Sequence, residues 1–279
     1  MATPQKETKR KLPGVVDIAY EQYKRDLQRY QLAKEIMSKN VVTTVPEASL
    51  KDVSRLMGEK HIGSLIVMKY KTPVGIVTER DLLSKVLAYG EFIGDEKVED
   101  VMSYPLFSVS STAKIKEVAQ LMISRKGRLA VFYAGTLVGI VAASDLIKSL
   151  PEVAETEVQV DDFMTKNVIT ADEEAFVINI AKIMGKHRIG SVIITRDDEP
   201  FGIFTERDLL TNFLATGKSM YTELGSVCSH PLIVIHSGES VHRAAAAMAL
   251  KHIRRLPVVR NDKLIGIITA RDLVEAYAK

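Results

Sequence analysis

Tryptophan is absent from this chain of 279 residues, and cysteine occurs only once, at position 228. A single cysteine cannot form a disulfide bond within the chain, which is typical of proteins kept in a reducing cytoplasm. No apolar run approaches the roughly 18 residues of a membrane-spanning helix. The N-terminus is charged and lacks an apolar core, so it does not resemble a secretory signal. These absences predict a cytoplasmic protein without a membrane partner.

The motifs of common catalytic sites are missing as well. The sequence contains no Walker A loop, no G-x-G-x-x-G, no H-E-x-x-H and no paired cysteines that would bind zinc. Its 6 histidines are scattered over the chain and do not form a triad by sequence. His61, His187 and His252 are expected at helix ends, with a spacing that suits no metal site. We therefore expect a protein that is not an enzyme, with no catalytic residues and no metal.

What the sequence does contain is one short motif in four copies. Each copy begins with glycine, continues with two apolar residues and ends with an aspartate directly before a leucine. The copies cover residues 75–81, 139–145, 202–208 and 266–272, so their glycines lie 63 or 64 residues apart. A fixed period of this kind indicates a repeated structural unit.

The aspartates that end the motif are open to two interpretations. Aspartate is a favoured helix N-cap, because its carboxylate accepts the free N–H groups of the first turn, and a helix start can also bind an anion. The four residues are therefore either helix caps or ligand contacts. A cap alone does not explain the threonine found three residues earlier in three of the copies. The residues concerned are Asp81, Asp145, Asp208, Asp272, Thr78, Thr205 and Thr269.

Each motif belongs to a longer unit. In the first unit we expect a short β segment at 41–45, an amphipathic helix from Leu50, and strands at 64–68 and 74–77. Near-continuous apolar runs such as 191–194 are typical of strands buried on both faces. The order β-α-β-β-α, repeated four times, predicts an α+β fold in which helices cover small sheets. Cys228 stands where the other units have methionine, which predicts a small core side chain.

The units also alternate in kind, since the first and third share Thr-Glu-Arg-Asp at 78–81 and 205–208. Both also have Ile-Gly-Ser before the preceding strand, whereas the second and fourth have neither. This alternation indicates a pair of units that was duplicated once. A unit of about 60 residues is too small to bury its own sheet face, so we expect each pair to close its own core.

These patterns predict the organisation of the chain. The acidic stretch near position 155 is the expected linker between the pairs. The predicted parts are a basic arm at 1–14, an amphipathic helix at 15–35, a first pair at 36–150 with repeats 36–98 and 99–150, a linker at 151–157, and a second pair at 158–279 with repeats 158–224 and 225–279.

The positive charge of the chain is concentrated in its first 35 residues. This segment carries eight basic and five acidic residues, which equals the net charge of +3 of the whole chain. Such asymmetry suggests an acidic partner such as RNA, although a charged tail that only keeps the protein soluble would look the same. Tyrosines interleaved with basic residues over 20–30 can also contact RNA, although most stripes of this kind dock on the body of the protein. The candidate RNA-binding residues are Lys6, Lys9, Arg10, Lys11, Lys24, Arg25 and Arg29.

With its glycine-to-aspartate motif in four copies, the chain from 36 to 279 resembles the cystathionine-β-synthase (CBS) domain family. The arrangement is similar to that of archaeal stand-alone proteins with two tandem CBS pairs. The resemblance implies that two domains pack through their sheets about a pseudo-twofold axis and bind adenosine-containing ligands in the clefts between them. It further implies that the aspartate holds the ribose hydroxyls and that the threonine helps to place ribose or phosphate. A carboxylate can accept two hydrogen bonds from a vicinal diol, which fits that role.

The match to the implied site is complete at Thr78 with Asp81, Thr205 with Asp208, and Thr269 with Asp272. In the second copy Ala142 replaces the threonine, so only the carboxylate of Asp145 remains there. Arg128 and Arg255 match a position that faces phosphate in some nucleotide-binding members, such as the gamma subunit of AMP-activated protein kinase. Alternatively, these two arginines only end a strand in solvent.

We therefore expect a non-catalytic sensor that binds an adenine nucleotide and acts on a macromolecular partner. The ligand would be AMP, ADP or ATP, or else NAD, S-adenosylmethionine or a cyclic dinucleotide. Three classes of function remain open. The protein could regulate an enzyme or transporter, bind RNA or the ribosome as a translation-silencing (hibernation) factor, or bind a nucleotide with no partner. A protein partner or a homodimer is compatible with the first class.

Overall fold

The computed structural model of the chain describes residues 32–85, 96–125, 127–149 and 158–279. The predicted arm at 1–14 lies outside these residues, as do residues 15–31 of the predicted N-terminal helix and the predicted linker at 151–157. Within the described part, no helix is long and apolar enough to cross a membrane.

The first pair contains two repeats of the predicted order. The first repeat comprises α2 (Ala33–Ile36), β1 (Thr43–Thr44), α3 (Leu50–Glu59), β2 (Ser64–Lys69), β3 (Thr72–Thr78) and α4 (Glu79–Lys85). The second comprises α5 (Val98–Val101), β4 (Ser108–Ser110), α6 (Ile115–Arg125), β5 (Leu129–Tyr133), β6 (Thr136–Val141) and α7 (Ala143–Ile147).

The second pair repeats this order. Its first repeat comprises the 3-10 turn η3 (Val160–Asp162), β7 (Thr170–Asp172), α8 (Val177–His187), β8 (Ser191–Arg196), β9 (Glu199–Thr205), α9 (Glu206–Leu209) and the π-helical segment η4 (Leu210–Leu214). Its second comprises the 3-10 turn η5 (Leu224–Ser226), β10 (Ile235–His236), α10 (Val241–Lys251), β11 (Arg255–Arg260), β12 (Lys263–Thr269) and α11 (Ala270–Ala278). The predicted β-α-β-β-α order and the α+β class are thus confirmed.

Each repeat forms its own three-stranded sheet. The short first strand pairs in parallel with the middle strand, which pairs antiparallel with the third, as in β1-β2-β3. The first strand is shorter than predicted, because only Thr43 and Thr44 pair along β2. Val41 and Val42 instead pack as partly buried side chains against the core.

The two repeats of a pair are joined reciprocally through the repeated glycines. A Cβ atom at Gly139 would lie 2.5 Å from Met37 Sδ, and one at Gly75 would lie 2.9 Å from the carbonyl oxygen of Ser103. Cys228 Sγ approaches Gly202 in the same way, at 2.8 Å from the ideal Cβ position. Cys228 is buried, as its place in the repeat predicted. The motif glycine is needed because the opening segment of the partner repeat passes directly over it.

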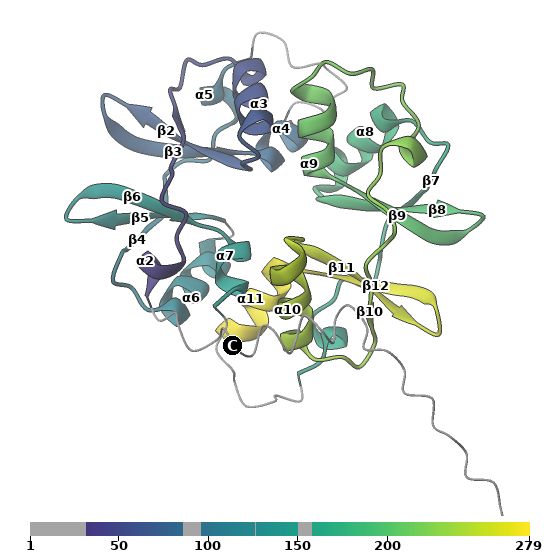
Figure 1. Cartoon of the computed structure of the whole chain (residues 1–279). Coiled ribbons are helices and arrows are strands. Elements are labelled where there is room, and N and C mark those ends of the chain that lie inside the picture. The colour runs from purple at the N-terminus through teal and green to yellow at the C-terminus, as the bar shows by residue number, and fades with distance from the viewer. Residues whose placement is uncertain (1–31, 86–95, 126, 150–157) are drawn as a thin grey trace, which may run out of the picture.

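The pairs themselves meet through helices. In Figure 1 the β2–β3 and β5–β6 hairpins point to one side and the β8–β9 and β11–β12 hairpins to the other, with the helices between them. Leu83 of α4 packs in the core of the third repeat, and Leu210 of η4 packs in the core of the first. The largest buried cluster joins the second repeat to the fourth, with Leu146 of α7 near Leu273 of α11.

The expectation that each pair closes its own core is therefore wrong. Between the two sheets of the first pair, the buried cluster comprises Ile66, Ile76 and Ala130 among the described residues, with partly buried neighbours. The larger clusters cross the boundary between pairs. The helices α4, α7 and α11 each have an apolar face that points away from the sheet of their own repeat and packs against the other pair. At this boundary Gly58 of α3 lies so close to Ala215 that an added Cβ would come within 2.5 Å of Ala215 Cβ.

Candidate functional site

The motif aspartates lie at the third position of their helices rather than at the N-cap. Thr205 is the N-cap of α9, its hydroxyl oxygen accepts from Asp208 N–H, and Asp208 Oδ2 accepts from Thr205 N–H at 2.8 Å. Thr269 and Asp272 repeat the bond to Oδ2 at 2.7 Å. This reciprocal arrangement is a capping box. It accounts for the threonine as well as the aspartate, so the interpretation of aspartate as the cap itself was wrong.

Capping leaves one oxygen of these carboxylates for other partners. In the described part of the chain, the hydrogen bonds made to Asp145, Asp208 and Asp272 all engage Oδ2. Burial raises the pKa of all three carboxyls above the ordinary value of aspartate, and the capping hydrogen bonds only partly oppose this shift. Each carboxylate is thus held at a fixed place and partly removed from water.

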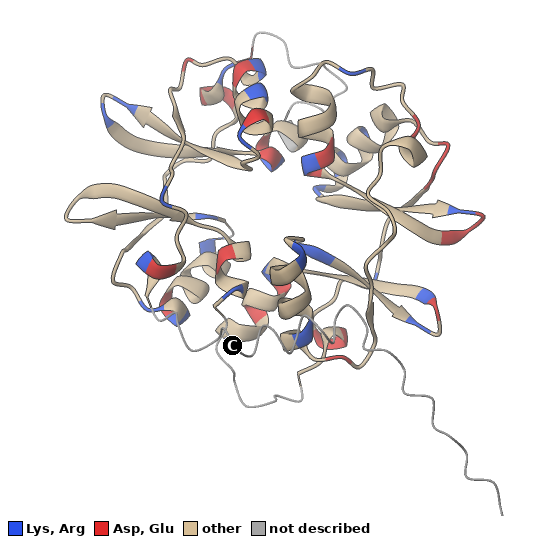
Figure 2. Cartoon of the chain, viewed as in Figure 1, with Lys and Arg blue, Asp and Glu red and all other residues tan. Residues whose placement is uncertain are grey.

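Between the pairs lies a cluster of two buried glutamates and five arginines, which we call the central cluster. The Glu-Arg dipeptides that follow Thr78 and Thr205 exchange ion pairs across the pair boundary. Arg207 Nε lies 3.3 Å from Glu79 Oε1, and Arg80 Nε lies 3.1 Å from Glu206 Oε1. Figure 2 shows charged residues of both pairs facing one another at this place. The members of the central cluster are Glu79, Glu206, Arg80, Arg128, Arg207, Arg254 and Arg255.

The fourth repeat supplies two further contacts to the glutamates. Arg254 Nη2 lies 3.3 Å from Glu79 Oε2, and Arg255 Nη2 lies 3.4 Å from Glu206 Oε2. The side chains of Glu79 and Glu206 are only 2% and 7% exposed. A buried carboxylate is tolerated only when it is paired and hydrogen-bonded, which explains why two arginines meet each glutamate.

Two glycines make room for these ion pairs. A Cβ atom at Gly63 would lie 2.8 Å both from Arg128 Nη2 and from Glu79 Oε2. At Gly190 it would collide with the Arg255 guanidinium and lie 2.9 Å from Glu206 Oε1. The Ile-Gly-Ser segments that distinguish the first and third repeats are therefore needed for a close approach of charged side chains.

The charges of the cluster shift one another's pKa. Burial alone would raise the pKa of Glu79, but the positive charges of Arg254, Arg128 and Arg207 outweigh burial and hold it below its ordinary value. Burial lowers the pKa of Arg128 and of Arg255, each opposed by the nearest glutamate. Glu79 is therefore an ionised carboxylate that compensates part of the positive charge of the surrounding arginines.

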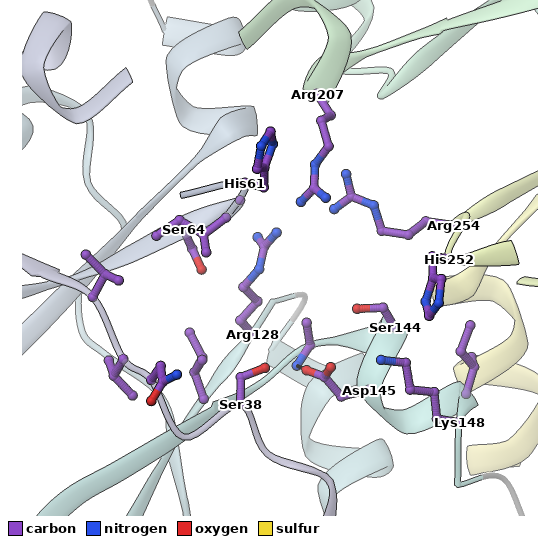
Figure 3. A pocket seen from close by; sticks show the side chains of 18 of the residues that line it. Ser38, His61, Ser64, Arg128, Ser144, Asp145, Lys148, Arg207, His252 and Arg254 are labelled. Carbon is purple, nitrogen blue, oxygen red and sulfur yellow. Dashed lines mark hydrogen bonds between the residues drawn. The ribbon is translucent and has the colours of Figure 1, made fainter. Parts of the chain in front are cut away.

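A cavity of about 260 Å³ opens on one side of the central cluster. Figure 3 shows the side chains of Arg128, Arg207 and Arg254 converging on it, with Asp145 at its other end. These three arginines come from the second, third and fourth repeats, so only the assembled molecule forms the site. His61, Lys148 and His252 add further nitrogen atoms to its wall.

A larger cavity of about 830 Å³ is lined by both glutamates of the central cluster, Glu79 and Glu206. Its lining includes the Thr78 and Asp81 of the first repeat together with the Thr269 and Asp272 of the fourth. Arginines of several repeats lie along the same cavity, namely Arg80, Arg125, Arg128, Arg188, Arg254, Arg255 and Arg271. The two aspartates and the arginines thus share one continuous space across the pair boundary.

The expected site residues are therefore distributed unevenly. Asp145, in the copy without threonine, lines the smaller cavity, whereas the pairs Thr78 with Asp81 and Thr269 with Asp272 line the larger one. Neither cavity is lined by Thr205 or Asp208. Arg128 and Arg255 are half-buried among charges rather than ending a strand in solvent. The RNA-binding candidates from Lys6 to Arg29 lie outside the described residues.

Sequence reasoning missed several residues of this site. Glu79 and Glu206 stood in the Thr-Glu-Arg-Asp motif, and their occurrence only in alternate repeats was a usable signal. Arg254 was not predicted, although its neighbour Arg255 was. His61 and His252 were expected to be ordinary helix-terminal residues, and both indeed follow helix ends with positive φ angles of 51° and 54°. They nevertheless also line the smaller cavity.

Comparison with known proteins agrees with this architecture. An uncharacterized protein from Methanopyrus kandleri is 39% identical over 121 residues, which cover 42% of this chain and 62% of that protein. The uncharacterized protein MJ1404 from Methanocaldococcus jannaschii is 28% identical over 88% of this chain and 61% of its own length. This chain thus spans about three fifths of the length of these two relatives.

A crystal structure from an archaeon shows the same fold. The crystal structure of protein MJ1225 from Methanocaldococcus jannaschii superposes with a TM-score of 0.74 over 88% of this chain and all of that chain, at 20% identity. The CBS domain pair of protein MJ0100 from the same organism has been solved in complex with 5′-methylthioadenosine and S-adenosyl-L-methionine. It matches 43% of this chain and 99% of its own at 28% identity, with a TM-score of 0.40.

The family model of the CBS domain matches residues 33–88, 98–152, 160–215 and 224–279. These four ranges cover most of the chain, each contains one glycine-to-aspartate motif, and the four sheets coincide with them. The chain therefore belongs to the CBS domain family and contains four copies of the domain in two pairs.

Proposed function

We propose that this protein is a non-catalytic, cytoplasmic sensor whose clefts bind an adenosine-containing ligand, namely AMP, ADP or ATP. The observation that carries the proposal is the smaller cavity, in which Asp145 faces three convergent guanidinium groups. A carboxylate can accept hydrogen bonds from the two ribose hydroxyls. Guanidinium groups bind phosphate through two parallel hydrogen bonds, which suits the opposite end of the same ligand.

The proposal does not need the motif threonine as a ligand contact. Thr78, Thr205 and Thr269 each donate a side-chain hydrogen bond to the capping aspartate, at 2.7 to 2.8 Å. Ala142 therefore removes part of a capping box and leaves Asp145 able to bind ribose. We place the first ligand at Asp145 and further ligands in the larger cavity, at Asp81 and Asp272.

Calorimetric titration with adenosine, AMP, ADP and ATP tests the proposal. Asp145→Ala should weaken binding of every adenosine-containing ligand about 10- to 100-fold, as expected for loss of a charged hydrogen-bonding partner. Arg254→Ala should weaken the phosphorylated ligands and leave adenosine unchanged. Asp162→Ala is the matched control, because Asp162 caps η3 through its carboxylate in an exposed position. Equal affinity of folded Asp145→Ala and wild type would rule out the ribose role.

The output of such a sensor would be a change in how the two pairs are arranged. The smaller cavity takes residues from both pairs, so a ligand that fills it favours one arrangement over others. A partner that contacts both pairs would respond to that preference. This fits a regulatory subunit of an enzyme or transporter, or a homodimer in which the second copy is the partner.

A second candidate is an RNA- or ribosome-binding factor that silences translation. It is favoured by the basic segment, which carries the entire net charge of +3. A relative 28% identical over 178 residues is known as a 33.4 kDa protein in the ribosomal RNA operon of Thermofilum pendens. Sedimentation with ribosomal subunits at two salt concentrations tests this function, because phosphate contacts weaken with salt. Removal of residues 1–14 should abolish co-sedimentation and leave nucleotide binding intact.

A further inference from the structure

Glu79 and Glu206 play no part in the ligand contacts described so far, yet they are the most enclosed charged side chains of the central cluster. Each follows the N-cap of its helix directly and points between the pairs, where two arginines meet it. The cluster contains five arginines and two glutamates, so the glutamates balance less than half of its positive charge. A site that only had to bind phosphate would not need them.

The arginines that hold the glutamates are those that line the cavities. Arg207 and Arg254 bind Glu79, and both line the smaller cavity beside Asp145. Arg80 and Arg255 bind Glu206, and both line the larger cavity. Both glutamates and Arg254 also line the larger cavity, so each cavity contains two arginines that are engaged with a glutamate.

We propose that Glu79 and Glu206 are specificity-determining residues, which compete with ligand phosphates for these arginines and thereby favour ligands of low negative charge. A guanidinium has five N–H donors, so one phosphate group can share an arginine with a glutamate. A longer phosphate chain must draw the arginines away, which leaves a buried carboxylate without compensation and close to a like charge. The inference rests on the proposed function of the clefts and adds to it the class of ligand that they prefer, a nucleoside monophosphate over a triphosphate.

The same competition would link ligand charge to the joint between the pairs. The contacts of Glu79 with Arg207 and of Glu206 with Arg80 cross the pair boundary, where they hold α4 beside α9. A monophosphate leaves these contacts in place. A triphosphate that recruits Arg207 removes one of them, so the two ligands would stabilise different arrangements of the pairs.

The test is calorimetric titration of the full chain and of Glu79→Gln with adenosine, AMP, ATP and inorganic tripolyphosphate. Glutamine keeps the shape of the side chain and removes its charge. The affinity for ATP and for tripolyphosphate should rise about tenfold or more, AMP should gain less, and adenosine should not change, because juxtaposed like charges are costly in a buried site. Glu117→Gln on α6 removes one exposed charge that lines neither cavity and is expected to change none of the four affinities.

The outcomes separate this inference from the proposed function. Binding of AMP at Asp145 with no gain for ATP or tripolyphosphate in Glu79→Gln would overturn the competition and leave the nucleotide site standing. Absence of adenosine and AMP binding would defeat the nucleotide site, while tripolyphosphate, which needs no ribose contact, would still test the competition. If Glu79→Gln fails to fold, Glu206→Gln measures the same effect on the larger cavity. If Glu206→Gln does not bind tripolyphosphate more tightly than the wild type, the proposed competition is likewise overturned.

Discussion

At the scale of single residues, the motif aspartates serve the helix and the proposed ligand at the same time. An acid whose pKa is raised by folding binds its proton more tightly in the folded state. Its ionisation therefore disfavours folding above the raised pKa, and this penalty disappears as the pH falls below the unfolded value of about 3.9. At Asp145 burial raises the pKa, and Ala142 offers no hydroxyl to offset it.

Asp145→Asn is therefore predicted to stabilise the ligand-free protein at neutral pH, by about 0.5–1 kcal/mol. The asparagine oxygen can still accept the 2.8 Å hydrogen bond from Ala142 N–H, so the capping contact remains. The gain should shrink as the pH is lowered towards 4, where the wild-type carboxyl takes up its proton. Thermal melts at pH 7, 5.5 and 4 measure it. Asp162→Asn, in an exposed capping box, is the control, and a stabilisation that is equal at all three pH values would contradict the argument.

The residue scale is also where sequence reasoning reached only part of the site. Threonine and aspartate three positions apart are local, so the motif identified Thr78 and Asp81 without any knowledge of the fold. The contacts of Glu79 with Arg207 and Arg254 join residues 128 and 175 positions away. No periodicity specifies such contacts, because they depend on how the two pairs meet.

At the scale of elements, the period of the sequence predicted strands and helices well, because alternate burial and helix starts are local properties. The short first strands were predicted less well. Apolar residues such as Val41 pack against the sheet without joining it, and hydrophobicity alone does not separate these two situations. The reason for the repeated glycine also emerged only from the structure, since its contact comes from the opening segment of the other repeat.

Gly139→Ala is predicted to destabilise the protein by about 1–3 kcal/mol, which is typical of overpacking in a close-packed interior. The added methyl group would lie 2.5 Å from Met37 Sδ and 2.7 Å from Met37 Cγ, so the Met37 side chain or the segment that carries it must shift. Chemical denaturation measures the loss. Gly127→Ala is the control, since its nearest neighbour would be the Arg125 carbonyl oxygen at 3.9 Å. Combining Met37→Ala with Gly139→Ala should recover part of the lost free energy of unfolding. If nothing is recovered, the contact with Met37 is not the cause of the destabilisation.

At the scale of the whole molecule, the sequence predicted two pairs but not how they depend on each other. Pairing follows from the alternation of the repeats, which is visible along the chain. Leu83, Leu210 and Leu273 are buried across the pair boundary by amphipathic helices. Their sequence pattern shows that one face is apolar but does not specify the surface against which it packs. The central cluster lies at the same boundary, so the packing between pairs and the proposed ligand sites are built by one interface.

The two pairs are therefore predicted to be unstable or self-associated when separated, and to recombine when mixed. A fragment of residues 32–149 exposes Leu83 and Leu146, and a fragment of 158–279 exposes Leu210 and Leu273, while each keeps charged groups whose partners lie in the other. A fully buried leucine contributes roughly 1.5–3 kcal/mol, so several such losses approach the whole stability of a small domain. Size-exclusion chromatography and thermal melts of each fragment, alone and in an equimolar mixture, measure the effect.

The mixture of the two fragments should elute as a 1:1 complex with a higher melting temperature than either fragment. Because the ion pairs of Glu79 and Glu206 cross the same boundary, Arg207→Ala in the second fragment should weaken this complex. Two monomeric fragments, each melting at the temperature of the intact chain, would show instead that the pairs are independent, and that a ligand between them has no shared core through which to act.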